Sequence, residues 1–195
     1  MSEYRIAIAL WDGVEELDFA GPYEVLTAWS RGTERSISVK TYGRDGISVT
    51  CSHGLVVVSD ATLDELEEVD LFVQPGGDTR PLVADDAFVA RVRGIADAGA
   101  LMASVCTGAF VFEKAGLLEG RRATTHWGAI DRLEELGVTV DREARYVDEG
   151  QVVTAAGVSA GIDMALHLVA RLESDEMSAD VRRYIQYEPA AVSAA

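Results

Sequence analysis

A cysteine stands where an apolar stretch of the sequence meets a stretch of small residues. In the segment LMASVCTGAFVF, a predicted strand leads directly into Cys106, and Thr107 and Gly108 follow before a helix-forming stretch. This pattern is typical of a nucleophile elbow, in which a sharp turn lifts one side chain above the sheet. Amides at the start of a helix stabilise a thiolate, so we expect the pKa of Cys106 to fall by roughly two units from about 8.5. The pattern alone is equally compatible with a buried structural cysteine.

Paired glycines follow another predicted strand. Gly76 and Gly77 come directly after Val73-Gln74-Pro75, and glycines at such a turn let backbone N–H groups approach a ligand closely. Taken alone, the pair is an ordinary strand-to-helix turn. Beside a nucleophile elbow, the same turn is a candidate oxyanion hole.

An acidic residue lies in an apolar setting near the first predicted strand. Asp18 is flanked by Leu17 and Phe19, and the pair Gly21-Pro22 predicts a break in the chain just beyond it. Burial beside a cysteine would raise the pKa of Asp18 and make its carboxyl a proton donor. A helix cap or a solvated acid is the alternative interpretation.

The three histidines do not suggest a metal centre, because no two of them have the spacing of metal ligands. His126 could be an accessory base, although capping of the following helix or packing on Trp127 is the commoner role for such a residue. His167 lies in an apolar helical pattern, and His53 has no assigned role. The sequence contains no phosphate-binding loop and no GxGxxG motif with an acidic partner, so we predict no cofactor.

Apolar strands alternate with helical patterns along the whole chain, which predicts an α/β fold with a parallel sheet covered on both faces. We interpret residues 1–195 as a single domain with a frayed tail from about residue 189. The segment Ser48–Ser59 alternates like a small antiparallel excursion at an edge. The predicted strands are Arg5–Trp11, Ser36–Tyr42, Val69–Gln74, Ala100–Val105 and Val152–Ala155. The predicted helices are Glu15–Ser30, Asp86–Ala98, Thr107–Ala115, Gly128–Leu136, Ser159–Leu172 and Asp175–Tyr187.

Composition excludes several classes of function. The 195 residues carry 33 acidic and 17 basic side chains, a formal net charge of −16. A strongly acidic chain repels nucleic-acid phosphates and anionic lipid, so we expect neither as a partner. Only two cysteines are present, and no apolar run is long enough for a membrane span, so we expect a cytoplasmic protein.

Five motifs between Leu17 and Leu166 together resemble the ThiJ/PfpI superfamily. They are, in order, LDFAGPYEVL, QPGGDT, SVCTGAF, GLLEGRRATTHW and AAGVSAGIDMAL. The resemblance implies a flavodoxin-like three-layer sandwich, similar to class-I glutamine amidotransferases, with a mostly parallel central sheet. Within the superfamily the motifs are most similar to those of isonitrile hydratases, and SVCTGAF and ATTHW also occur in the ligand-sensing domain of some AraC-type regulators.

The resemblance also implies roles for individual residues. Cys106 matches the nucleophile, Asp18 the acid beside it, and Thr107 the hydroxyl residue after the cysteine. Two turns match the pocket, namely Gly76-Gly77, with an amide facing the nucleophile, and Gly157-Val158. Members of the superfamily are usually homodimers, so we expect a second copy of the chain as partner.

At one position the chain departs from the superfamily pattern, and this narrows the range of reactions that the resemblance implies. Protease-like members carry a histidine directly after the cysteine, and this chain has Thr107 there. Because no Cys–His dyad is evident, peptidase and glutaminase activities are less favoured as hypotheses. The resemblance therefore implies a lyase, an isonitrile hydratase, that forms a thioimidate on Cys106 and uses Asp18 as general acid and base. Two alternatives stay open: glyoxalase or deglycase chemistry on α-oxoaldehydes, and a ligand- or redox-sensing module without catalysis.

Overall fold

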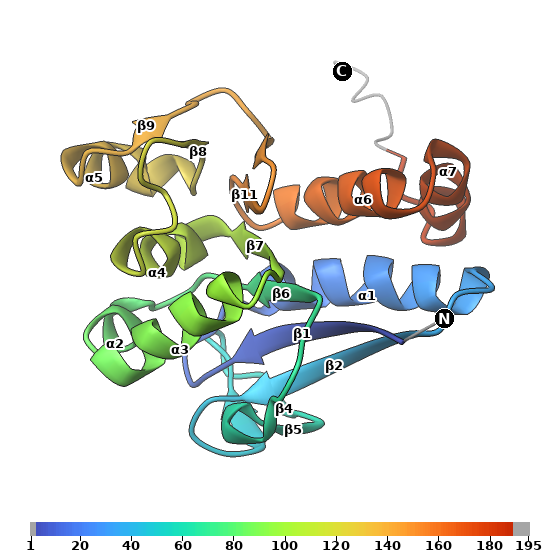
Figure 1. Ribbon diagram of the computed structural model, residues 1–195, viewed down its shortest axis with the longest axis horizontal. Helices are drawn as coiled ribbons and strands as arrows, with labels where there is room; N and C mark the ends of the chain where they lie inside the picture. Colours follow the sequence, from blue (N-terminus) through green and yellow to red (C-terminus); the bar gives the residue numbers. More distant parts are fainter. Residues whose placement is uncertain (1–2, 189–195) are drawn as a thin grey trace, which may run out of the picture.

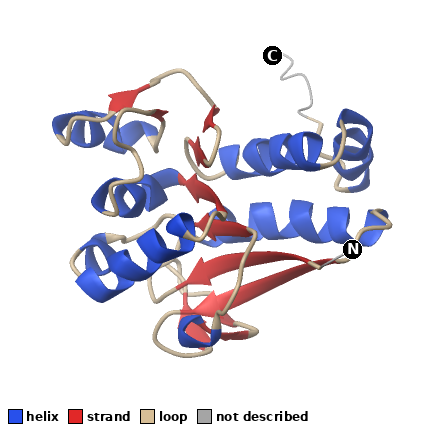
Figure 2. Ribbon diagram, viewed as in Figure 1, coloured by secondary structure: helices blue, strands red, loops and turns tan. Residues whose placement is uncertain are grey.

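A seven-stranded sheet forms the centre of the computed structural model, which describes residues 3–188 (Figures 1 and 2). The strand order is β10-β11-β7-β6-β1-β2-β5, and every neighbouring pair is parallel except β10 with β11. The central strands β6 and β7 are buried at every residue, as expected for a sheet covered on both faces. The strands are β1 (Tyr4–Leu10), β2 (Ile37–Gly43), β5 (Ala61–Thr62), β6 (Leu71–Gln74), β7 (Leu101–Val105), β10 (Tyr146–Glu149) and β11 (Val152–Ala155).

Helices cover the sheet in two layers, which confirms the predicted three-layer α/β sandwich (Figure 1). One layer contains α1, α6 and α7, which pack on one another, and the other contains α2, α3 and α4. A short helix, α5, follows the 3₁₀ turn η3. The helices are α1 (Glu16–Gly32), α2 (Arg80–Val83), α3 (Asp86–Asp97), α4 (Ala109–Lys114), α5 (Ile130–Glu135), α6 (Ala160–Leu172) and α7 (Asp175–Tyr184); the 3₁₀ turns are η1 (Leu63–Glu65), η2 (Cys106–Gly108) and η3 (Trp127–Ala129).

Two glycines allow α1 and α6 to approach closely above the end of β7. A Cβ on Gly21 would lie 2.9 Å from Ile162 Cγ1, and one on Gly161 would lie 3.1 Å from Val105 Cγ2. The predicted break at Gly21-Pro22 is therefore wrong, because α1 continues through Pro22. Proline lacks the N–H that would bond the carbonyl four residues earlier, but burial of this turn against α6 holds it helical.

The five predicted strands and the longer predicted helices are present, with ends shifted by a few residues. The antiparallel excursion is confirmed as a hairpin of β3 (Ser48–Thr50) and β4 (Val56–Val58), which forms its own small sheet. The sequence patterns did not predict β5, β10, α2 or the pair β8 (Arg122–Ala123) and β9 (Thr139–Val140). Most of these elements are too short to show a period. The predicted frayed tail falls on residues 189–195, outside the described part of the chain.

Parallel strands place their carboxyl ends at one edge of the sheet, and ligand sites of open α/β sheets lie at that edge. The ends of β1, β6, β7 and β11 therefore bring the N-terminus of α1, the Gly76-Gly77 turn, Cys106 and the Gly157-Val158 turn to the same side. Within residues 3–188, no helix has the length and apolar character needed to cross a membrane.

Candidate active site

Cys106 is the first residue of the 3₁₀ turn η2, directly after β7, and its backbone is strained. Its φ is +58°, a left-handed value that costs a non-glycine residue roughly 1–3 kcal/mol. The residue is 7% exposed, and it lines a cavity of about 500 Å³ at the strand ends. The backbone geometry is that of the predicted nucleophile elbow.

Asp18, in the first turn of α1, faces Cys106 and is completely buried. Its Oδ2 accepts a hydrogen bond of 2.9 Å from the N–H of Gly76, which holds the carboxyl at the end of β6. Its Oδ1 is buried and has no hydrogen-bond partner among residues 3–188. The thiol of Cys106 and the N–H of Val158 face the same carboxyl. The oxygen without a partner is thus available to take or give a proton.

The turn after β6 corrects one expectation. The Gly76 N–H is engaged by Asp18, and the Gly77 N–H donates to Thr107 Oγ1 at 3.0 Å. The Thr107 hydroxyl in turn donates to the Gly77 carbonyl at 2.8 Å. These two amides therefore do not form a free oxyanion hole. The Gly76 amide holds the Asp18 carboxyl, and the Gly77 amide holds the Thr107 hydroxyl. Only glycine fits, because a Cβ on Gly76 would lie 2.7 Å from both Asp18 Oδ2 and Thr107 Oγ1.

The pKa values of Asp18 and Cys106 also differ from expectation, because the sequence predicted a lowered pKa and a thiolate at Cys106. Desolvation raises the pKa of Asp18 from 3.8 to about 7, against the lowering effect of the Gly76 hydrogen bond. Desolvation and the adjacent Asp18 charge raise the pKa of the Cys106 thiol to about 12. The N–H of Thr107 opposes this shift without cancelling it. At neutral pH Cys106 is thus a thiol beside a carboxyl whose pKa is raised toward neutrality, which is a nucleophile with its own base.

Replacing Asp18 by asparagine is expected to stabilise the fold more at pH 8 than at pH 4. The folded-state pKa of Asp18 is about 7 against an ordinary 3.8, so the folded protein binds more protons than the unfolded one between these values. Stability of the wild type therefore falls as pH rises through this window. Each pKa unit corresponds to about 1.4 kcal/mol, so the advantage of Asp18→Asn should grow by about 2–4 kcal/mol. Urea unfolding of both proteins at both pH values measures this difference in the free energy of unfolding. A difference that does not depend on pH would contradict the raised pKa of the buried Asp18 carboxyl.

The cavity beside Cys106 brings several predicted residues together. Thr107, Gly77, His126 and Val158 line it with Cys106. Val158 has a positive φ of 46°, so its turn is strained like that of Cys106. A larger hollow of about 630 Å³ lies between α6, α7 and β10 and contains none of these residues.

His126 lines the cavity and also caps the 3₁₀ turn η3 that follows it. Its Nδ1 accepts a hydrogen bond of 3.3 Å from the N–H of Gly128, and its ring packs on Trp127 with centroids 5.3 Å apart. Gly157 gives it room, since a Cβ there would lie 2.6 Å from His126 Cδ2. The predicted capping role is therefore present, and the accessory catalytic role stays a prediction. His167 instead pairs with Asp148 at 2.7 Å on β10.

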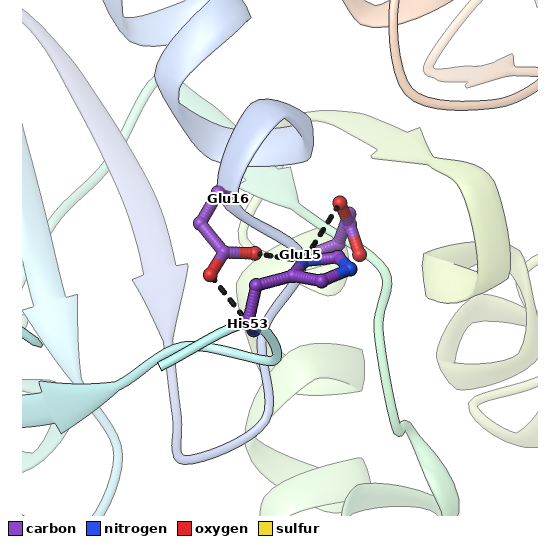
Figure 3. Close-up of side chains that lie close together, drawn as sticks. All are labelled: Glu15, Glu16 and His53. Atoms are coloured by element: carbon purple, nitrogen blue, oxygen red, sulfur yellow. Dashed lines mark hydrogen bonds and ion pairs between the residues drawn. The ribbon is translucent and has the colours of Figure 1, made fainter. Parts of the chain in front are cut away.

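An acidic and imidazole cluster at the cavity rim was not visible in the sequence. Glu15 and Glu16 at the start of α1 meet His53 from the β3–β4 turn (Figure 3). His53 Nδ1 lies 2.8 Å from Glu16 Oε2 and 3.6 Å from Glu15 Oε1. Although desolvation acts to raise it, hydrogen bonding from His53 and its backbone lowers the pKa of Glu16 to about 2. The three ligand atoms lie within 4.8 Å of one another and could hold a metal ion, and here they tie the hairpin to α1.

Comparison with known proteins assigns a family to this fold and site. Residues 4–171 match the DJ-1/PfpI family. The chain belongs to the DJ-1/PfpI family. The isonitrile hydratase of Pseudomonas putida is 35% identical over 187 residues, a match that covers 95% of this chain and 79% of the hydratase. A ThiJ/PfpI family protein from Pseudomonas syringae superposes with a TM-score of 0.88 at 28% identity, covering 98% of this chain and 78% of that one.

Part of a transcriptional regulator is also similar to this chain. The HTH-type transcriptional regulator CdhR of Pseudomonas aeruginosa is 35% identical over 139 residues, which covers 70% of this chain and 41% of the regulator. Drosophila melanogaster DJ-1beta shares the fold, with a TM-score of 0.85 at 21% identity and coverage of 96% of this chain and all of that one. The family thus includes both enzymes and parts of regulators.

Proposed function

We propose that this DJ-1/PfpI protein is an isonitrile hydratase, a lyase that adds water to an isonitrile and releases an N-substituted formamide. The observation that carries the proposal is the buried Asp18 carboxyl that faces the Cys106 thiol, with an Oδ1 that has no hydrogen-bond partner in the described chain. The 35% identity to the Pseudomonas putida hydratase supports the choice of substrate class.

The first step is addition of the thiol to the terminal carbon of the isonitrile. Sulfur forms the new bond with its lone pair while Asp18 takes the thiol proton. The carbon now carries a lone pair, and Asp18 returns the same proton to it, giving a thioimidate on Cys106 and a carboxylate again. A base with a pKa of about 7 is suited to both transfers. No oxyanion develops, so the engaged amides of Gly76 and Gly77 are no obstacle.

The second step is hydrolysis of the thioimidate. Asp18 takes a proton from water as its oxygen attacks the same carbon, and passes it to the nitrogen to give a tetrahedral adduct that carries a hydroxyl group. As the carbon–sulfur bond breaks, the hydroxyl oxygen becomes the formamide carbonyl and gives its proton to Asp18. Sulfur leaves with the bonding electrons and takes this second proton from Asp18. The sum is isonitrile plus water giving formamide, and the enzyme returns to its starting state without a cofactor.

The test of this function is formation of formamide from small aliphatic and aromatic isonitriles by the purified protein. We expect turnover with at least one isonitrile and none with methylglyoxal or glyoxal. Consumption of the α-oxoaldehydes in place of isonitriles would replace the proposal with glyoxalase or deglycase chemistry.

A second candidate is a small-molecule sensor, favoured by the match to the regulator CdhR over 70% of this chain. A sensor would use the cavity beside Cys106 for binding without turnover. Calorimetry with the same isonitriles separates the two, because saturable binding with no formamide supports sensing.

We propose that the protein is a homodimer that pairs through the β3–β4 hairpin. Four apolar residues of the hairpin and its flanks are at least half exposed, namely Ile47, Leu55, Val56 and Val58. Exposed apolar side chains that lie close together favour an interface with a protein partner. Light scattering at micromolar concentration should give twice the chain mass of 20.9 kDa. Val58→Glu should shift the mass toward the monomer, and a monomeric wild type would overturn the proposal.

A further inference from the structure

Thr125 is a buried residue to which neither the motifs nor the proposed mechanism gives a role. It follows β8, and its side chain is completely buried. Its hydroxyl donates a hydrogen bond of 2.7 Å to the backbone carbonyl of Cys106, 19 residues earlier in the chain. The preceding residue is anchored as well, because the N–H of Thr124 donates to Thr154 Oγ1 on β11 at 2.8 Å. The hydroxyl of Thr125 is therefore presented to the elbow by a fixed segment.

The carbonyl that Thr125 contacts belongs to the strained residue of the site. Cys106 keeps its φ of +58° only while the surrounding structure holds the turn. The Cys106 carbonyl also accepts from the N–H of Ala109 inside the turn, so Thr125 is its one donor from outside the strand–turn–helix unit in the described chain. The far end of the same peptide unit is the Thr107 N–H, which faces the Cys106 sulfur.

We propose that Thr125 is a positioning residue for Cys106, whose hydroxyl fixes and polarises the Cys106–Thr107 peptide so that the Thr107 N–H stays directed at the sulfur. A peptide group is planar, so fixing its oxygen fixes the direction of its N–H. A donor on the carbonyl also strengthens the N–H as a donor, because linked hydrogen bonds polarise one another. The inference rests on the proposed role of Cys106 as nucleophile, and it assigns the tuning of that nucleophile to a residue that touches no substrate.

The neighbour Thr124 provides a matched control. It is buried to the same degree, but its Oγ1 has no hydrogen-bond partner among residues 3–188. Replacing Thr124 by valine removes a hydroxyl of the same type, one residue away, without touching the Cys106 peptide. Asp18 from α1 faces Cys106 directly, and Glu15, His53, Asp78 and His126 are the other titratable groups on the cavity; none of them is altered in either variant.

The experiment measures the rate of alkylation of Cys106 by iodoacetamide from pH 6 to 10, with the Cys106 peptide followed by mass spectrometry so that Cys51 does not interfere. Loss of one net hydrogen bond corresponds to a rate lower by about three- to tenfold in Thr125→Val, with the rise in rate displaced to higher pH. Thr125→Ser should restore the wild-type profile, and Thr124→Val should leave it unchanged.

Two results would overturn the proposal: alkylation of Thr125→Val within twofold of the wild type at every pH, or an equal loss in Thr124→Val. If Thr125→Val does not fold, Thr125→Ala removes the same hydroxyl and decides the question by the same criteria. Alkylation requires no isonitrile, so the result is independent of the proposed function, which fails separately if the wild type makes no formamide.

Discussion

Replacing Cys106 by serine is expected to abolish formamide formation, with turnover lowered by at least about 10⁴-fold, as for other nucleophile substitutions. The structure gives the reason. Asp18 faces the thiol and can take its proton as sulfur attacks, whereas a serine hydroxyl is a weaker acid than a thiol and its oxygen is a poorer nucleophile for the isonitrile carbon. The side chain is otherwise accommodated in the same elbow, so melting behaviour should change little. Chromatography of the formamide product measures the effect.

Cys51→Ser is the matched control for this substitution. Cys51 is the other free thiol of the chain, is also buried, and does not line the cavity beside Cys106. We expect its turnover to match the wild type. Equal losses in the two variants, or a Cys106→Ser protein that retains turnover, would remove Cys106 from the chemistry.

Replacing Asp18 by asparagine should lower turnover by about 10²–10⁴-fold, the contribution of a positioned acid–base group. Asparagine keeps the size of the side chain and can still accept the Gly76 N–H, but it has no proton to exchange with the thiol. Wild-type activity should rise with pH through about 7 as Asp18 ionises, and Asp18→Asn should lose this rise. A pH–rate profile of kcat/KM for both proteins is the measurement.

Asp78→Asn controls for the loss of a negative charge at the same cavity. Asp78 lines the cavity but is paired with Arg80 at 2.7 Å. We expect this variant to keep the wild-type rate within a few-fold and to keep the rise through pH 7. A near-wild-type rate in Asp18→Asn would assign Asp18 to structure alone.

The parts of the site that could be predicted are those set by local sequence. The elbow is visible because an apolar strand, a lone cysteine and small residues are contiguous in the segment Leu101–Phe112. The approach of Asp18 to Cys106 followed from the resemblance and from the rule that parallel strands end at one edge. The order of strands in the sheet was not needed for this step.

The remaining features depend on contacts between distant segments. The capture of the Gly76 N–H by Asp18 joins residues 58 positions apart, and the Thr125 hydrogen bond depends on the path of the chain between β8 and β11. The raised pKa of Cys106 has the same origin, since helix-start amides are visible in sequence but the desolvation and the facing carboxylate that outweigh them are not. The rim cluster with His53 depends on where the hairpin folds back.

The most direct test of the account is detection of the thioimidate on Cys106. A small isonitrile is mixed with a molar excess of the protein, the reaction is quenched in acid after increasing times, and the intact mass and the Cys106 peptide are measured. We predict a mass gain equal to the whole isonitrile on Cys106 that appears first and decays as formamide is released, with no gain in Cys106→Ser. Formamide release by the wild type without an adduct on Cys106 at any time, or with the adduct on another residue, would contradict the account.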